Sequence, residues 1–250
     1  LQLYKSAFYP EAYSGLQRIK LLVLHALVFS FPFDIFYSNI AVITFILLVL
    51  LDYKNLNFKV LHLKTLLIQG VFWLSIFGYA YSSNYDAAGY LIERQLLIFI
   101  LPLVIPISIS IKPQQVTSLL FTLSGSCVIA VVYLFSNMLL NVYENYGTIN
   151  FDILFSGAFF NHYFTTPIGI HASYLSMYCV ISICSLTYEL ITVSCWKSNV
   201  IRLKMLLLLG LGIFFLASRN STISLLCILL FVTRAGSIGR INWPLLAPFM

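Results

Sequence analysis

The sequence predicts an all-α integral membrane protein with about eight transmembrane helices and a cytoplasmic N-terminus. Three observations support this fold class. Of the 250 residues, 60% are hydrophobic and only 9% are charged, whereas a soluble domain has about 25% charged residues. The apolar residues form runs close to the roughly 20 residues that a spanning helix needs. The basic residues lie in short clusters between these runs, so the net charge of +6 does not indicate a nucleic-acid partner.

The predicted spans follow one another with little polar sequence between them, so a single polytopic membrane domain is expected over 1–250. The spans are 19–33, 36–51, 65–82, 95–111, 116–140, 167–189, 201–217 and 221–233. Pro102 and Pro106 fall inside the fourth span and predict a kink. Thr166 and Pro167 predict the start of the sixth, because Thr caps helices and Pro suits the first helical position.

The last two spans are short, each with about 13 strongly apolar residues or roughly 20 Å of helix. Basic residues precede and follow this pair of spans: Lys197, Arg202, Lys204, Arg234 and Arg240. Cytoplasmic segments of membrane proteins carry an excess of Lys and Arg. Both clusters are therefore placed in the cytoplasm, so the chain crosses the membrane and returns, with an external turn at 218–221.

With a cytoplasmic N-terminus, twelve of the fourteen basic residues lie on the cytoplasmic side. Arg94 and Arg219 are the exceptions, each at the outer mouth of an apolar helix. Arginine near hydrocarbon costs a few kcal/mol unless it reaches the headgroups or finds a partner, so both suggest an anionic ligand. Two alternatives stay open: Arg94 pairs with Glu93 or Asp86 or reaches the headgroups, and Arg219 is a turn residue at the headgroups.

Arg219 lies where a helix is expected to begin at about Thr222, capped by Asn220 or Ser221. The N-terminus of this helix faces outward and carries free N–H groups and a partial positive charge. Arginine beside a helix N-terminus makes a good phosphate site. In a membrane, the expected ligand is a lipid-linked phosphate.

The longest polar segment is the predicted outer loop 141–166, which is rich in Asn, Tyr and Phe. Such side chains suit an interfacial belt, and they also suit sugars. His162 lies at the end of this loop, and His171 is expected about one turn into the following helix. An intramembrane histidine suggests a general base or a ligand for phosphate or hydroxyl groups. The alternative for His171 is a hydrogen bond between helices.

The sequence contains no nucleotide-binding loop, no HExxH metal motif and no GxSxG nucleophile elbow. Nothing in it therefore suggests a metal site, ATP or a redox cofactor.

Three stretches together resemble the O-antigen ligase and polymerase family of bacterial envelopes. They are Glu93-Arg94-Gln95-Leu96, His171-Ala172-Ser173-Tyr174-Leu175-Ser176 and Leu216-Ala217-Ser218-Arg219-Asn220-Ser221. The second is similar to an HPxYxS stretch of some members. The third is similar to the family's SRG signature, with Asn220 in place of the glycine. The resemblance covers roughly 90–233, and the earlier spans agree in topology alone.

The resemblance implies an inverting, metal-independent glycosyltransferase of the bacterial inner membrane that needs no cofactor. Such enzymes move a glycan from undecaprenyl pyrophosphate to lipid A-core or another acceptor glycolipid at the periplasmic face. It implies that Arg219 binds the pyrophosphate leaving group and that Arg94 is a second phosphate contact, because positioned arginines stabilise charge on a leaving group. The expected substrate contacts at the same face are His171, His162, Tyr174, Asn220 and Ser221.

Several departures and alternatives accompany this prediction. The family's large periplasmic loop, with its catalytic histidine, would follow later spans that this chain lacks. The chain is therefore expected to be an N-terminal fragment that is inactive alone, and His171 is not assigned the catalytic role. An O-antigen or capsule polymerase would use the same donor. A transporter or flippase for a lipid-linked or anionic substrate is the alternative of another class, although nearly charge-free spans argue against it. A structural membrane subunit would tolerate neutral replacement of Arg94 and Arg219.

Overall fold

A computed structural model describes residues 13–60, 67, 69–148, 154, 159–192 and 196–237. This part of the chain is helical, and no strand occurs in it. The helices are α2 (Gly15–Ser30), α3 (Ile35–Leu51), α5 (Gly70–Tyr79), α6 (Tyr85–Ser108), α7 (Pro113–Tyr146), α9 (His162–Thr165), α10 (Ala172–Thr192), α11 (Trp196–Leu216) and α12 (Arg219–Ser237). Short 3-10 turns are η1 (Tyr53–Asn55), η2 (Phe58–Val60) and η4 (Thr166–Ile168).

Four of the described helices are long and apolar enough to cross a membrane. They are α6, α7, α10 over Ala172–Ile191 and α11 over Asn199–Leu216. The helices α3 and α5 are apolar but shorter. Together with the composition, these helices indicate a membrane protein and confirm the predicted all-α class for the described residues. The count of eight spans and the cytoplasmic N-terminus stay predictions.

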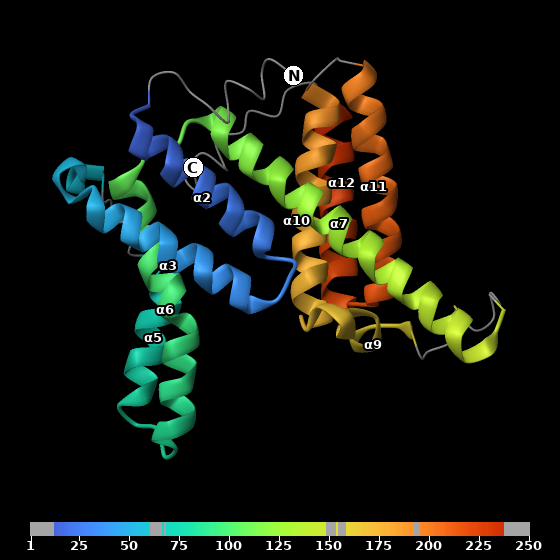
Figure 1. Ribbon diagram of the computed structural model, residues 1–250, viewed down its shortest axis with the longest axis horizontal. Coiled ribbons are helices and arrows are strands. Elements are labelled where there is room, and N and C mark those ends of the chain that lie inside the picture. The colour runs from blue at the N-terminus through green and yellow to red at the C-terminus, as the bar shows by residue number, and fades with distance from the viewer. Residues whose placement is uncertain are drawn as a thin grey trace.

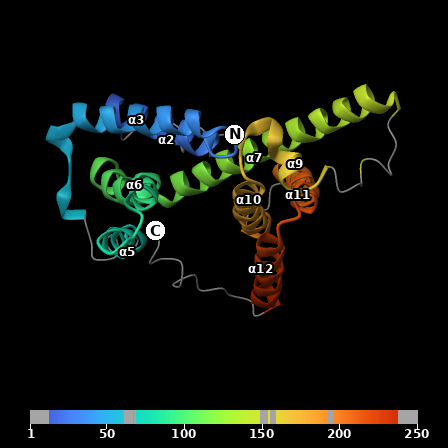
Figure 2. The same ribbon diagram turned by 90° about the horizontal axis from the view of Figure 1, so that it is seen from below.

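The long helix α7 connects two groups of helices (Figure 1). On one side it packs against α2, which pairs with α3, while α5 and α6 form a hairpin nearby. On the other side it packs against α10 and α11, and α12 packs on α10. The view in Figure 2, turned by 90°, keeps the two groups apart with α7 running through both. We call them the α2 group (α2, α3, α5, α6) and the α10 group (α9, α10, α11, α12).

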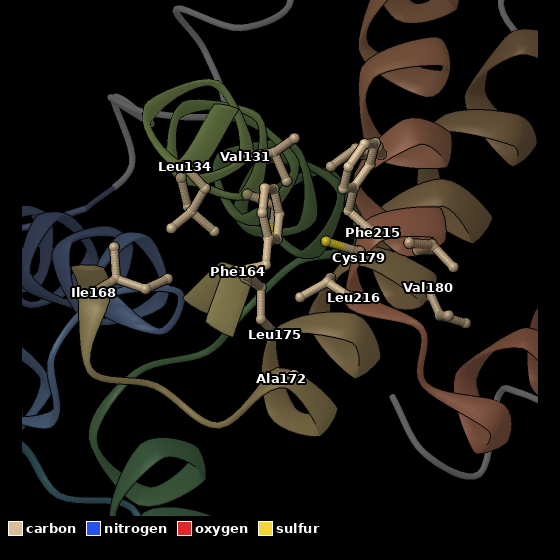
Figure 3. Packing of buried hydrophobic residues seen from close by; sticks show 14 of the residues in the cluster. Val131, Leu134, Phe164, Ile168, Ala172, Leu175, Cys179, Val180, Phe215 and Leu216 are labelled. Atoms are coloured by element: carbon tan, nitrogen blue, oxygen red, sulfur yellow. The ribbon is translucent and has the colours of Figure 1, made fainter. Parts of the chain in front are cut away.

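The larger apolar core lies where α7 meets the α10 group (Figure 3). Val131 of α7, Leu175 of α10 and Leu216 of α11 are fully buried there, and Phe164 of α9 stacks obliquely on Phe215, with ring centroids 5.5 Å apart. The helices α7 and α11 approach closely at Gly212. A Cβ at Gly212 would lie 2.7 Å from a Val131 methyl carbon, so the crossing requires a residue without a side chain, as helix contacts in membranes often do.

The smaller apolar core lies between α2 and α3. A polar contact at one end of these helices supplements it. The Lys20 Nζ donates to Asp52 Oδ2 at 2.6 Å and to the Ser108 backbone oxygen at 3.4 Å. Because Lys20 is in α2, Asp52 follows α3 and Ser108 ends α6, this Lys20 clamp joins three helices. The sequence places Lys20 on the cytoplasmic side but does not predict its burial, with 0% of its surface exposed.

Among the helix starts that differ from the sequence prediction, those of α6 and α10 have a clear local cause. The helix α6 begins at Tyr85, ten residues before the predicted 95, because Asn84 Oδ1 accepts the Ala87 N–H at 3.0 Å and caps an earlier first turn. The sixth span was predicted to start at Pro167, but Thr166–Ile168 is only a 3-10 turn. It ends at Gly169, whose φ of +67° is left-handed and stops the helix. The helix α10 starts at Ala172 instead.

Candidate substrate site at the starts of α10 and α12

The first turns of α10 and α12 lie side by side. Ser176 Oγ in α10 and Ser221 Oγ in α12 are 2.6 Å apart, and both side chains are buried. Ser218 Oγ donates to Ser221 Oγ at 3.2 Å, which adds the α11–α12 turn to this contact. The N-terminal ends of both helices therefore lie within about one turn of the same hydrogen bond. Helix N-termini carry partial positive charge and N–H groups without a partner inside the helix, so this end of the α10 group suits an anion.

Arg219 is the first residue of α12, and its side chain is exposed. The Thr222 N–H donates to the Ser218 backbone oxygen at 3.0 Å, so the helical hydrogen bonds already start there. The predicted start at Thr222 was therefore three residues late, and the cap by Asn220 or Ser221 was wrong. Asn220 and Ser221 lie in the first turn of α12, where Asn220 is exposed and Ser221 faces α10.

His162 and His171 meet at the start of α10. Their ring centroids are 3.9 Å apart, the rings are tilted by 71°, and both side chains are exposed. His171 Nδ1 accepts the Ser173 N–H at 3.3 Å, so this nitrogen carries no proton and the neutral ring has its proton on Nε2. His171 thus precedes α10 as a capping residue, whereas the sequence predicted it one turn inside the helix. The Tyr174 ring lies beside it, with centroids 5.9 Å apart.

Arg94 lies on α6, and the side chains of Arg94 and Glu93 fall outside what the structure describes. The helix α6 belongs to the α2 group, whereas α12 packs on α10. Figures 1 and 2 both show α6 and α12 well apart, in the two helix groups that α7 connects. A shared pyrophosphate contact of Arg94 and Arg219 therefore stays a prediction.

A pocket of about 510 Å³ lies between α7 and the α9–η4 segment. Its lining includes Tyr133, Asn137, Asn141, Phe159, Tyr163 and Thr166. The last four belong to the predicted outer loop 141–166, but the loop prediction missed that α7 extends to Tyr146 and that Tyr133 and Asn137 contribute. Two asparagines four residues apart, and so on one face of a helix, were the signal that could have identified this site.

A buried ion pair lies at the far end of α10 from the candidate site. Arg202 Nε donates to Glu189 Oε2 at 2.8 Å, and both side chains are only 3% exposed. Arg202 Nη1 also donates to Asn199 Oδ1 at 3.0 Å. The sequence places Arg202 on the cytoplasmic side, but its pairing with Glu189 was not predicted.

No protein-family model matches the chain, and no match was found among curated proteins or among solved structures. The resemblance to the O-antigen ligase and polymerase family therefore rests on three short motifs alone.

Proposed function

We propose that this chain belongs to an integral membrane glycosyltransferase of the O-antigen ligase type. It transfers a glycan from undecaprenyl pyrophosphate to lipid A-core or another acceptor glycolipid at the outer face of the bacterial inner membrane. The observation that carries the proposal is the 2.6 Å hydrogen bond between Ser176 and Ser221. It holds the starts of α10 and α12 together, so that His171 and the exposed Arg219 are at the same end of one helix group.

Arg219 is assigned to the pyrophosphate. A guanidinium group forms two parallel, charge-assisted hydrogen bonds with phosphate oxygens. The N–H groups in the first turn of α12 add donors next to it. As the bond between the sugar carbon and the pyrophosphate oxygen breaks, the electron pair leaves with the pyrophosphate. Positive charge positioned there stabilises the transition state more than the bound substrate.

The histidine pair is assigned to the acceptor, because the two rings are in contact and therefore lie on one side of the reacting carbon. In inverting transfer, an acceptor hydroxyl attacks the sugar carbon opposite the pyrophosphate and loses its proton as the new bond forms. His162 is the proposed acceptor of that proton, since a neutral imidazole is a suitable base near neutral pH. His171 has its proton on Nε2, because Nδ1 accepts the Ser173 N–H, so it is the proposed donor to another hydroxyl group of the acceptor.

A polymerase would use the same donor and the same role for Arg219, with another polymer as the acceptor. A transporter or flippase for a lipid-linked or anionic substrate is favoured by a different observation, the buried pair of Arg202 and Glu189. Ionisable side chains inside a helix bundle often line a path for protons or substrates. The experiment on Arg219 therefore needs to separate transfer from transport.

In the test, the native host cell expresses the Arg219→Ala or the Arg219→Lys variant in place of the wild-type protein. Lys204→Ala is the matched control, because Lys204 is an exposed basic residue toward the far end of the neighbouring helix α11. The readouts are the ladder of surface polysaccharide and the amount of lipid-linked precursor, at equal protein levels.

For Arg219→Ala, we expect loss of polymer on its lipid anchor and accumulation of precursor at the periplasmic face. Arg219→Lys should retain only part of the activity, because an ammonium group cannot form the bidentate contact. Lys204→Ala should give a normal ladder. A normal ladder for Arg219→Ala would reduce Arg219 to a turn residue and sink the transferase proposal. Accumulation of precursor at the cytoplasmic face would favour the transporter.

A further inference from the structure

We propose that the pocket between α7 and the α9–η4 segment binds uncharged sugar residues, as a glycan subsite separate from the phosphate contact at Arg219. This inference rests on the proposed function for its place in a reaction. Its physical basis, however, is the lining of the pocket itself.

The pocket has the size and polarity for a neutral ligand. Its volume of about 510 Å³ is within the range of roughly 300–1,000 Å³ that is typical of small-molecule sites. None of the described side chains that line it carries a charge at neutral pH. A phosphate or carboxylate would have no cation to pair with there, so the ligand must be bound by hydrogen bonds and apolar contact.

Two amides on one face of α7 provide the hydrogen bonds. Asn141 Nδ2 donates to Asn137 Oδ1 at 2.9 Å, and this bond fixes which way the two amides point. It leaves the Asn137 NH₂ group as a donor and the Asn141 carbonyl oxygen as an acceptor. Neighbouring hydroxyl groups of a sugar both donate and accept, so they can form hydrogen bonds with the free donor and the free acceptor at the same time.

Aromatic rings provide the apolar surface. Tyr133, Phe159 and Tyr163 line the pocket, and Tyr163 is 72% exposed. An aromatic face packs against the C–H face of a sugar ring, while a tyrosine hydroxyl can bond its polar edge. A lipid acyl chain would use the rings but would offer no acceptor to the NH₂ group of the half-buried Asn137, which costs free energy. The combination therefore favours a sugar over a lipid tail.

The short α9–η4 segment links the pocket to the histidine pair. Thr166 lines the pocket, and its Oγ1 donates to the His162 backbone oxygen at 3.0 Å. The Asn161 N–H donates to the Phe215 backbone oxygen at 2.9 Å, which fastens this segment to the end of α11. A glycan in the pocket would therefore lie next to the histidine pair.

Saturation-transfer NMR on the purified chain in lipid nanodiscs tests the inference. The probes are glucose, galactose, N-acetylglucosamine and maltose, each at millimolar concentration. We expect at least one of them to receive saturation from the wild-type protein, and we expect Asn137→Leu and Asn141→Leu each to lower the transfer at least five-fold. Ser136→Ala is the control, because this exposed residue is on the same helix but does not line the pocket. Equal thermal unfolding of all variants shows that they are folded.

No transfer to any of the four sugars, or the same transfer to the wild type and to Asn137→Leu, would overturn the inference. The variant Arg219→Ala separates the pocket inference from the proposed function. This variant should bind the sugars as the wild type does, because Arg219 does not line the pocket. Sugar binding together with a normal polysaccharide ladder for Arg219→Ala would support the pocket and refute the transferase.

Discussion

The α2 group and the α10 group each contain a buried ion pair, but they differ in the size of the apolar core beside it. In the α10 group, a large apolar core shared with α7 fixes the helices, and aromatic rings of α9 and α11 interlock within it. In the α2 group, the core between α2 and α3 is small, and the Lys20 clamp joins the ends of three helices. The candidate substrate site is on the α10 group. This agrees with the general requirement that a site be positioned by well-packed elements.

The α5–α6 hairpin has even less apolar packing than the rest of the α2 group. Its helices are joined by the stacked rings of Phe72 and Phe99, with centroids 4.8 Å apart. Much of its other apolar surface faces outward, and Leu74 is 71% exposed. Such a surface suits lipid, which solvates leucine as well as another helix does. Changes in this hairpin should therefore affect stability less than changes at the clamp or in the α10 group.

The largest expected effect is the loss of stability when the Lys20 clamp of the α2 group is removed. Lys20→Met removes the cation from a pair whose side chains are only 0% and 8% exposed. Loss of one partner from a buried ion pair costs about 3–5 kcal/mol, because the other charge stays buried. Unfolding of the purified protein in mixed micelles measures the change. The double variant Lys20→Met/Asp52→Leu should recover most of the loss, and a loss below about 1 kcal/mol for the single variant would contradict the buried clamp.

The next effect compares the same substitution in the two groups. Leu175→Ala in α10 should lower the free energy of unfolding by about 2–5 kcal/mol, because the side chain is fully buried and leaves a cavity. Leu74→Ala in α5 should change it by less than about 0.5 kcal/mol, since most of that side chain is exposed. The same micelle titration measures both, and equal losses would show that the packing contrast between the groups is not real.

A smaller effect is expected at the close crossing of α7 and α11. Gly212→Ala forces the new methyl against the buried and stiff Val131 side chain and should cost about 1–3 kcal/mol. Gly210→Ala is the control on the same helix, because a Cβ there meets nothing within 4 Å. It should stabilise the helix slightly, by up to about 1 kcal/mol. Similar losses for the two variants would argue against the crossing.

The smallest expected effect is a change in the stability contributed by Asp52 at acidic pH. Hydrogen bonds from Lys20, and then from Asn55, lower the pKa of Asp52 below its ordinary value of 3.8. A carboxylate with a lowered pKa contributes stability that is present above the unfolded pKa and is lost as the pH falls through the folded pKa. The difference in unfolding free energy between the wild type and Asp52→Asn should therefore be constant near neutral pH and shrink below about pH 4. A difference that increases as the pH falls would contradict the lowered pKa of Asp52.

Much of the helical fold could be predicted from the sequence, because long apolar runs determine where helices lie. The predicted span 36–51 matches α3 within one residue, and the predicted span 201–217 ends within one residue of α11 but begins five residues after it. The errors concern where helices begin and end. Asn84 caps α6 within a polar stretch that hydrophobicity ignores, and Gly169 ends a turn that Thr166 and Pro167 had suggested would continue.

The sequence identified single residues of the candidate site but not the contacts between them. Arg219 and His171 are identified by charge and by short motifs, since each is an unusual residue at the mouth of an apolar helix. The contact of Ser176 with Ser221 and the amide pair in α7 were not predicted. Both depend on which helix faces meet. The contact of the two serines leaves little signal in an apolar sequence, whereas two asparagines four residues apart were a signal for the amide pair.

The 34 residues of α7 extend for about 51 Å, well beyond a hydrocarbon layer of roughly 30 Å. Even a steep inclination of about 40° embeds only some 26 residues of a helix in the hydrocarbon, so at least one end must extend beyond this layer. The final turns carry Asn141, Glu144 and Asn145 and are suited to project. The mouth of the pocket would then lie at the lipid headgroups, and its height above them would vary with bilayer thickness. We expect ligand access to this protein to depend on the acyl-chain length of the surrounding lipid.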